Sequence, residues 1–441
     1  MVVWNYNRKK TREGCFDMLI EIKVSNFLSF KDEQKFSMVA LNKYTELKDN
    51  LINIEDNFSV LKTASLFGAN GSGKSNLFEA IRFIRRAVLS SFRDSDKKLL
   101  DSHFKLNPKY KELDSFFEIV FFSNDKLVRY SFGMGRERMN SEQLFIDEEL
   151  IFNVLQGKLI YINESFLDET ETMMKWKIKN NKTLFLSILS KTNTEFIDFI
   201  IEYFRCDLNV IQCLGSRSAN YTKNLVNNKS ELTPLVLKLL KEADVNIIDL
   251  DTKEREVDFK NLIEKDVPEE MLTRLKLNKM QLLTKHNIYD DSGNVIDNIM
   301  FDSESNESSG TNEILRIAGP IADTLENGRV LILDEMDAQL HPLMANYVIS
   351  LFHSSINKNN AQLIISSHNP EILSNDILRR DQIWFVEKDV TEASHLTSLI
   401  NYRDKGEVIR KDVNFRKNYL QGKFGAIPLL KPSNIMDEGE I

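Results

Sequence analysis

Apolar residues along the chain recur with the spacing of strands in some segments and of helices in others. The apolar residues of segment 18–24 predict a strand. A short apolar run over 64–67 predicts a second, buried strand, and apolar positions three and four residues apart over 77–88 predict a helix directly after it. Segments 116–122 and 127–132, which a polar pair separates, predict a β-hairpin.

The chain from about 161 to 285 has a different pattern, because its apolar residues follow helical spacing. Segments 184–189, 196–204 and 235–240 each form one apolar helical face. No heptad run is long enough for an extended coiled coil, no CxxC pair occurs there, and no internal repeat is visible. We therefore expect a mainly helical insertion over 161–285.

The last third of the chain alternates predicted helices and strands. A helical face runs from about 312 to 326 and is followed by Gly328, a residue type that commonly ends helices. The runs 330–333, 363–365 and 383–386 are continuously apolar, as strands buried on both faces of a parallel sheet are. This alternation predicts an α/β fold.

The amino-terminal residues 1–17 carry no apolar periodicity, whereas the strand pattern begins at once at Met18. Two explanations stay open for this segment. It is either a disordered extension, or Met18 is the true start of the protein.

Composition excludes several classes of protein. The 441 residues include 66 Asp or Glu and 58 Lys or Arg, and a net charge of −8 argues against a uniformly basic nucleic-acid-binding surface. Because the three cysteines form no CxxC pair, we expect neither a structural zinc site nor a disulfide scaffold, and a cytoplasmic location is the default. No run of 18 uninterrupted apolar residues predicts a membrane span.

Glycine is scarce, with 16 residues, yet three lie between 68 and 73. They belong to the run Gly68-Ala-Asn-Gly-Ser-Gly-Lys74-Ser75, which matches the P-loop pattern between a predicted strand and a predicted helix. A glycine turn that happens to precede Lys-Ser is the structural alternative, and the flanking elements disfavour it. ATP contacts are therefore expected from Gly68, Ala69, Asn70, Gly71, Ser72, Gly73, Lys74, Ser75 and Asn76.

Each of these residues has a physical role in such a loop. Glycines let backbone N–H groups point at a phosphate, and the following helix adds its positive amino-terminal end. Lys74 is expected to reach the β- and γ-phosphates, and Ser75 to bind Mg²⁺.

A second motif, which is acidic, follows the apolar strand predicted over 330–333. Asp334 would complete the Mg²⁺ site with Ser75, and Glu335 would act as the base that polarises a water for attack on the γ-phosphorus. Alone, a buried strand that ends in an acidic helix cap explains this pattern equally well. The P-loop upstream favours the catalytic interpretation.

Two further features distinguish families of P-loop proteins. The run Glu307-Ser-Ser309-Gly310-Thr opens a helix 24 residues before Asp334, and a serine-glycine helix terminus binds phosphate, although Ser is also an ordinary helix cap. His368 ends a predicted buried strand 34 residues after Asp334. A histidine there is either structural or a contact of the γ-phosphate, and its spacing favours the contact.

Together these motifs resemble the ABC-type ATPase head, in the branch that includes RecF, SMC and the OLD-family nucleases. The resemblance implies an α/β P-loop NTPase of the ABC/RecF-head type, with a mixed sheet and flanking helices, that uses ATP and Mg²⁺. It divides the chain into an amino-terminal lobe at 18–160, the insertion, and a carboxyl-terminal lobe at 286–441. The Gln-loop of this class could not be placed.

In this branch of ATPases, two heads sandwich two nucleotides. The resemblance therefore implies a homodimer, or a higher homo-oligomer through the heads, in which Ser309, Gly310 and Asp337 act on the ATP of the other copy. The opening segment 22–30 also looks like the first strand of RecF-like heads, and this likeness adds Asn26 as a nucleotide contact.

A closer resemblance extends over nearly the whole chain. The signature run, the segment 334–342 and the tail Phe415–Pro428 look like the RloA and AbiLi group of bacterial abortive-infection ATPases, and more distantly like AriA, the ATPase of the PARIS defence system. The resemblance implies a separately encoded effector, such as a nuclease or a Toprim- or RloB-type protein. Only 73 residues follow His368, and they lack the clustered acidic metal ligands of the Toprim domain in OLD proteins.

The tail is basic, because residues 403–423 hold seven Lys or Arg and three Asp or Glu. It is either a dock for an acidic partner or a nucleic-acid backbone, or a solvated helix with scattered charges. DNA binding thus stays open.

Three functions follow from the sequence. The first is a sensor-regulator ATPase of an anti-phage system, and the second is a DNA-repair or chromosome-maintenance clamp of the RecF or SMC type. The third is a scaffold that holds ATP without hydrolysis, which Glu335 and His368 disfavour.

Overall fold

The computed structural model describes residues 17–55, 58–91, 102–136, 138–164, 183–190, 195–212, 216–254, 280–337, 340–404 and 407–428. The expectation for residues 1–17 falls almost entirely outside this part of the chain. The first strand, β1, begins at Met18, where the apolar pattern begins. Within the described residues, no helix is both long and apolar enough to cross a membrane.

One sheet is antiparallel and belongs to the amino-terminal third of the chain. Its strand order is β10-β9-β8-β7-β6-β1-β2. The predicted hairpin is present as β6 and β7, which pair in register from Ser115↔Met134 to Ser123↔Lys126. The strands are β1 (Met18–Ser25), β2 (Gln34–Ser37), β6 (Ser115–Ser123), β7 (Lys126–Met134), β8 (Met139–Ile146), β9 (Glu149–Leu155) and β10 (Lys158–Ile162). A small ribbon, β3 (Leu51–Glu55) with β4 (Phe58–Leu61), accompanies it.

The second sheet is mostly parallel and has the order β11-β15-β16-β5-β17-β18, with only β17 and β18 antiparallel. Its strands are β5 (Thr63–Phe67), β11 (Leu208–Gln212), β15 (Val330–Asp334), β16 (Gln362–Ser367), β17 (Ile383–Lys388) and β18 (Ser394–Ser398). A neighbouring pair, β19 (Arg403–Asp404) and β20 (Glu407–Val408), precedes the tail.

The parallel sheet separates two hydrophobic cores. On β15, Val330 and Ile332 face one core while Leu331 and Leu333 face the other. The first core also holds the antiparallel sheet and the helix α1 (Lys74–Ser90), and the second holds the helices α9 (Ser309–Asn327) and α10 (Pro342–His353). Burial on both faces explains why these strands are continuously apolar in sequence.

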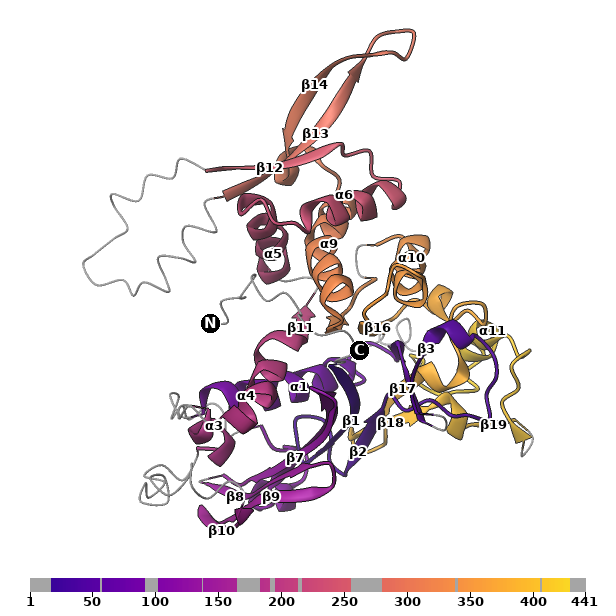
Figure 1. The fold of residues 1–441 in the computed structure, drawn as a ribbon. Helices are drawn as coiled ribbons and strands as arrows, with labels where there is room; N and C mark the ends of the chain where they lie inside the picture. The colour runs from indigo at the N-terminus through magenta and orange to yellow at the C-terminus, as the bar shows by residue number, and fades with distance from the viewer. Residues whose placement is uncertain are drawn as a thin grey trace, which may run out of the picture.

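The stretch expected to be mainly helical, 161–285, also contains strands. Its helices are α3 (Phe185–Leu189), α4 (Glu195–Glu202), the π-turn Tyr203–Asp207, α5 (Ser216–Asn227) and α6 (Thr233–Glu242). However, β11 lies in the parallel sheet beside β15, so this stretch is not a separate insertion throughout. A three-stranded sheet of β12 (Asp249–Glu254), β13 (Met280–Tyr289) and β14 (Val295–Asp302) follows, and its β13–β14 hairpin projects from the helical layer of α5, α6 and α9 (Figure 1).

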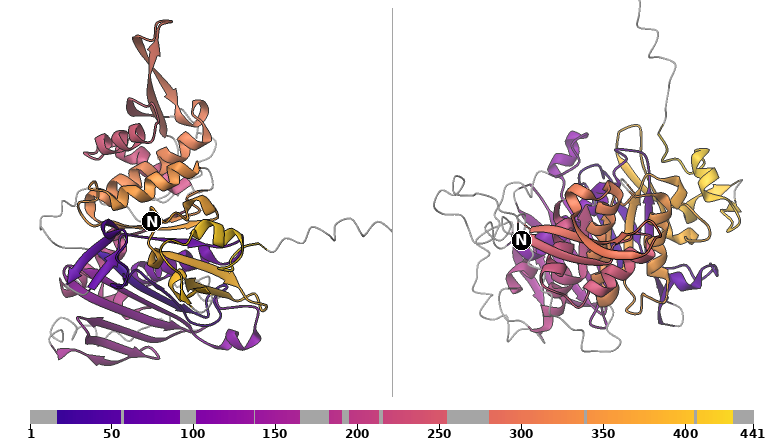
Figure 2. Two further views of the ribbon diagram at one scale, coloured as in Figure 1. Left: turned by 90° about the vertical axis from the view of Figure 1, so that its right-hand side faces the viewer. Right: turned by 90° about the horizontal axis from the view of Figure 1, so that it is seen from above.

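The short helix α8 (Ser303–Asn306) joins this hairpin to α9. The tail helix α11 (Phe415–Leu420), yellow in Figure 2, lies away from the hairpin and packs near β5 and β17. The tail is not simply a solvated helix. Tyr419 and Phe424 are buried and stack on Phe385 of β17, at ring-centroid distances of 5.5 and 5.3 Å. The charged residues of α11, Arg416 and Lys417, are on its exposed side.

Candidate functional site

The glycine-rich run forms the turn between β5 and α1. Gly71 and Gly73 have φ values of +73° and +111°, a backbone conformation that residues other than glycine rarely adopt. A Cβ on Gly73 would also overlap the hydroxyl oxygens of Ser29 and Ser394, and one on Gly68 would overlap the carbonyl oxygen of Val386. Both the conformation and the packing of the turn therefore require glycine.

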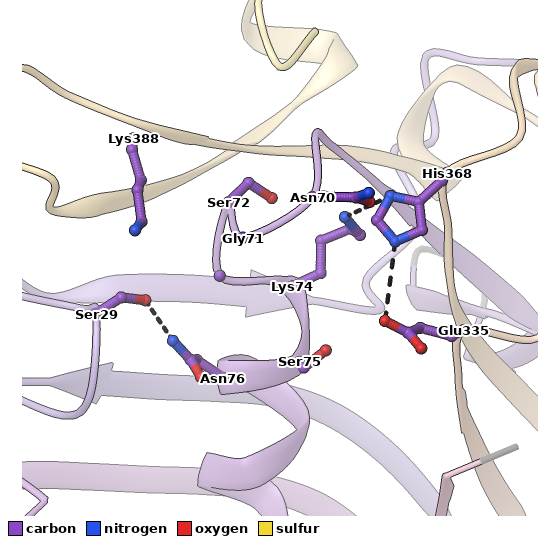
Figure 3. Close-up of a pocket in the computed structure, with 11 residues that line it drawn as sticks. Ser29, Asn70, Gly71, Ser72, Lys74, Ser75, Asn76, Glu335, His368 and Lys388 are labelled. Atoms are coloured by element: carbon purple, nitrogen blue, oxygen red, sulfur yellow. Dashed lines mark hydrogen bonds and ion pairs between the residues drawn. The ribbon is translucent and has the colours of Figure 1, made fainter. Parts of the chain in front are cut away.

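A cavity of about 280 Å³ opens over this turn (Figure 3). It is lined by Ser29, Asn70, Gly71, Ser72, Gly73, Lys74, Ser75, Asn76, Glu335, His368 and Lys388. The amino terminus of α1 faces the cavity, so its N–H groups and its dipole favour an anion there.

Lys74 lies folded back against the turn. Its side-chain ammonium donates hydrogen bonds to the carbonyl oxygens of Gly68 at 2.7 Å and Ala69 at 3.0 Å, and it lies 3.2 Å from Nδ1 of His368. Burial lowers the pKa of Lys74 to about 8, and the nearby carboxylates of Asp334, Glu335 and Asp337 oppose that effect. A phosphate in the cavity would replace these carbonyl contacts with charged partners.

The carboxyl end of β15 brings Asp334 to the start of α1. The hydroxyl of Ser75 donates to Oδ1 of Asp334 at 3.1 Å. Ser366, on the neighbouring strand β16, donates to the same oxygen at 2.7 Å and accepts the backbone N–H of Glu335 at 2.8 Å. A hydroxyl and a carboxylate oxygen this close together are a donor set that suits Mg²⁺, which keeps its other positions for phosphate oxygens and water.

Glu335 and His368 face each other across the cavity. Oε1 of Glu335 lies 3.9 Å from Nε2 of His368, and both side chains are about a third exposed, at 39% and 34%. Glu335 has a positive φ of 56°, a strained backbone of the kind that gathers at functional sites. The backbone N–H of His368 donates to Oδ2 of Asp337 at 3.2 Å. This bond joins the segment after β16 to the segment after β15.

One predicted contact lies elsewhere. Asn26 is buried, and its amide donates to the carbonyl oxygens of Tyr110 and Leu113 while its Oδ1 accepts the N–H of Phe104. Its side chain thus holds neighbouring loops and does not line the cavity. Ser29, three residues later, is the residue of that segment that lines the cavity, so the nucleotide contact predicted for Asn26 has no support from the cavity lining.

The residues expected to act on another copy do not line this cavity. Ser309 and Gly310 begin α9, where Ser308 caps the helix by accepting the N–H of Thr311 at 3.0 Å. Ser309 is exposed.

Two residues of the glycine-rich turn, Gly68 and Ala69, are also not among those that line the cavity. Their carbonyl oxygens accept hydrogen bonds from Lys74.

Sequence reasoning missed Ser29, Lys388 and Ser366. Asn76 donates to the hydroxyl of Ser29 at 2.6 Å, so Ser29 packs beside the amino terminus of α1. Lys388 comes from the end of β17 and approaches the cavity from the side opposite His368 and Glu335 (Figure 3). No motif spacing could have identified Ser366 and Lys388, because only the sheet order brings β16 and β17 beside β5.

A protein family described as "AAA domain, putative AbiEii toxin, Type IV TA system" matches residues 64–374, more than half of the chain. The chain belongs to this AAA family. The matched range includes the P-loop, the strand that ends at Asp334, and His368. The family match and the mostly parallel sheet confirm the predicted α/β P-loop NTPase fold.

Two solved structures are similar to the chain. One is the SMC head domain from Thermotoga maritima, and the other is an SmcHead bound to the C-winged helix domain of ScpA. Each is 12% identical with a TM-score of 0.44, and the alignments cover 86% of this chain and 98% or 97% of the other. No curated protein matches the sequence at a significant level.

Proposed function

We propose that this AAA-family protein is a Mg²⁺-dependent ATPase that serves as the sensor-regulator subunit of a bacterial anti-phage, abortive-infection system. Its ATP cycle would control a separately encoded effector such as a nuclease. The observation that carries the enzymatic part is the meeting of three distant segments, around Lys74, Asp334 and His368, at one cavity.

The residues of the cavity account for each requirement of ATP hydrolysis. Backbone N–H groups of the turn and the ammonium of Lys74 bind the phosphates. Glu335 accepts the proton of the attacking water, and His368 donates a hydrogen bond to the γ-phosphate. Ser75 and Asp334 would hold Mg²⁺, which would supply positive charge to offset the charge on the phosphate oxygens.

The proposed catalytic unit is a head-to-head homodimer. The amino terminus of α9 carries an exposed Ser309, and the positive end of a helix attracts anions, so it can bind the phosphate of an ATP held by a second copy. Asp337 has a buried Oδ1 with no hydrogen-bond partner among the described residues, and it lies beside His368. A second head that supplies a donor would satisfy this oxygen.

The defence role rests on two further observations. The tail Phe415–Pro428 looks like that of the RloA and AbiLi group, and the description of the matched family names a toxin–antitoxin system, which pairs two components. Both support a protein that acts with a separately encoded partner.

The enzymatic part is tested with purified protein and two substitutions. Glu335→Gln should bind ATP normally but lower turnover by about 10²-fold or more, because the proton acceptor is lost. Lys74→Ala should lose ATP binding. Glu326→Gln, an acid-to-amide change at the far end of α9, is the control and should leave both unchanged. Unaltered turnover in Glu335→Gln would refute the assigned base.

The defence part is tested by phage plating on cells that carry this gene with its neighbouring gene. Wild type should reduce plating, and Lys74→Ala should abolish the reduction. ATP turnover that duplex DNA stimulates, with salt-sensitive DNA binding, would instead favour a repair or chromosome-maintenance clamp.

A further inference from the structure

The β13–β14 hairpin concentrates exposed apolar side chains. Residues 291–300 are all exposed, a run of ten. Five of the 14 exposed large apolar residues in the described chain lie within 289–300: Tyr289, Val295, Ile296, Ile299 and Met300, exposed by 57, 54, 63, 41 and 40%. Single exposed apolar residues are ordinary, but a cluster on a projecting element marks an interaction site.

The backbone of β14 is also unpaired along one edge. β12 pairs with residues 280–285 of β13, and β14 pairs with residues 283–289 on the other side. Among the described strands, none pairs with the outer edge of β14. Beyond the end of β12 the hairpin is a two-stranded ribbon, which is marginally stable in water, and its open edge is a template for another strand.

Charge determines which strand can add there. The hairpin carries Asp290, Asp291, Asp297 and Asp302, with Lys285 and His286 as its only basic residues. Two copies of β14 side by side would bring like charges together, so self-pairing is disfavoured. A strand with apolar residues on one face and Lys or Arg on its flanks would satisfy both the apolar surface and the carboxylates.

The base of the hairpin contacts Glu307, two residues before the start of α9 at Ser309. Nε2 of His286 on β13 lies 2.7 Å from Oε1 of Glu307, and Thr284 donates to the same oxygen. Asp302, the last residue of β14, caps α8 by accepting the N–H of Glu304 at 3.1 Å. A strand that changes the twist of β13 and β14 would therefore move the start of α9.

We propose that the β13–β14 hairpin is the docking arm for a partner protein, which adds a basic and apolar strand to the outer edge of β14. Glu307 then links the docking arm to the start of α9 at Ser309 and Gly310. This link rests on the proposed function, in which the start of α9 completes the ATP site of a second copy. The docking itself does not depend on that function.

The docking is tested with a capped, dye-labelled peptide of alternating Lys and Val and its Glu–Val counterpart, added to the full-length protein. The Lys–Val peptide should bind and slow hydrogen exchange of the amides of 295–301, and the Glu–Val peptide should not. Ile296→Asp should weaken Lys–Val binding by tenfold or more although it adds negative charge. Ile160→Asp is the matched control, because Ile160 is 58% exposed on another edge strand, β10.

Three results would overturn the docking arm: no protection of β14, equal loss of binding in both variants, or self-association that Ile296→Asp abolishes, which would assign the edge to a second copy. The link is tested in the same samples by ATP turnover. The Lys–Val peptide should change turnover of wild type but not of His286→Ala, which should still bind it. Binding without any change in wild-type turnover would refute the link, while loss of turnover in every sample would refute the ATPase proposal instead.

Discussion

At the scale of single residues, Lys74 makes nucleotide binding depend on pH. Burial lowers its pKa to about 8, so the free protein carries a charged Lys74 below pH 8 and a neutral one above. Only the charged form attracts phosphate. ATP affinity should therefore be constant below pH 8 and fall by up to about tenfold per pH unit above it.

Titration of a fluorescent ATP analogue between pH 7 and 9.5 measures this dependence. Lys74→Arg keeps its charge over the whole range, so any remaining affinity of that variant should not follow the same curve. A wild-type affinity that stays flat to pH 9.5 would contradict the pKa assigned to Lys74.

Lys388 should be a second cation for the nucleotide. It lines the cavity, and its ion pair with Glu392 is long, at 3.6 Å, with a carboxylate that is 68% exposed. Lys388→Ala should raise the Kd for ATP about 3- to 10-fold, an effect that added salt weakens. Equilibrium binding at two salt concentrations measures it, with Lys358→Ala, an exposed lysine away from the cavity, as the control. Equal affinity of the two variants would remove Lys388 from the site.

The residues that sequence reasoning identified are those whose chemistry is local. The turn from Gly68 to Ser75 contains its own glycines, helix start and lysine, so the motif specified the cradle without knowledge of the fold. Ser366 could not be found in this way, because its hydroxyl matters only where β16 lies beside β15. Asn26 shows the limit of a family pattern, which predicted a ligand role for a side chain that bonds three backbone groups in this structure.

At the scale of elements, the tail packs against β17 and stabilises its position. Glu387 accepts the N–H of Ala426 at 3.2 Å, while the next residue, Lys388, faces the ATP cavity. The tail also contacts the segment after β16, because Arg416 of α11 forms an ion pair with Glu371, three residues after His368. The end of β17 and the segment after His368 thus both rest on the tail, whose two sequence interpretations did not include buried packing.

Removal of the ring of Tyr419 should destabilise the protein. Tyr419 is 4% exposed and contacts both Phe67 and Phe385, so Tyr419→Ala should cost about 3 kcal/mol. Lys417→Ala, on the exposed side of the same helix, should change stability by less than about 0.5 kcal/mol. Urea unfolding compares the two, and similar midpoints would mean that the tail does not brace the sheet.

Elements with one clear apolar face were predictable. α1 and α9 both occur where the apolar spacing predicted them, although α9 is buried on nearly all sides from Glu313 to Leu325. β14 was not predictable, because Val295–Met300 is exposed on both faces and has no buried side to produce an alternating pattern. β12, with the sequence DLDTKE, is too polar for a strand signal.

At the scale of the whole molecule, the parallel sheet places the chemistry. β5, β15 and β16 are neighbours, so the turn after Phe67, Asp334 and the residues after Ser367 meet at the carboxyl edge of one sheet. Ligands of open α/β sheets bind at this edge. Ser309 and Gly310 lie outside the cavity, which is why the proposed site requires a second copy.

Mixing two inactive variants tests this composite site most directly. Lys74→Ala removes the phosphate-binding lysine, and Ser309→Arg blocks the exposed start of α9. In a mixed dimer, the intact turn of one copy meets the intact Ser309-Gly310 of the other, so one of the two sites is restored. With random pairing, an equimolar mixture should recover roughly a quarter of wild-type ATP turnover, although each variant alone is inactive. Turnover no higher than the sum of the two separate variants would contradict a site shared between two heads.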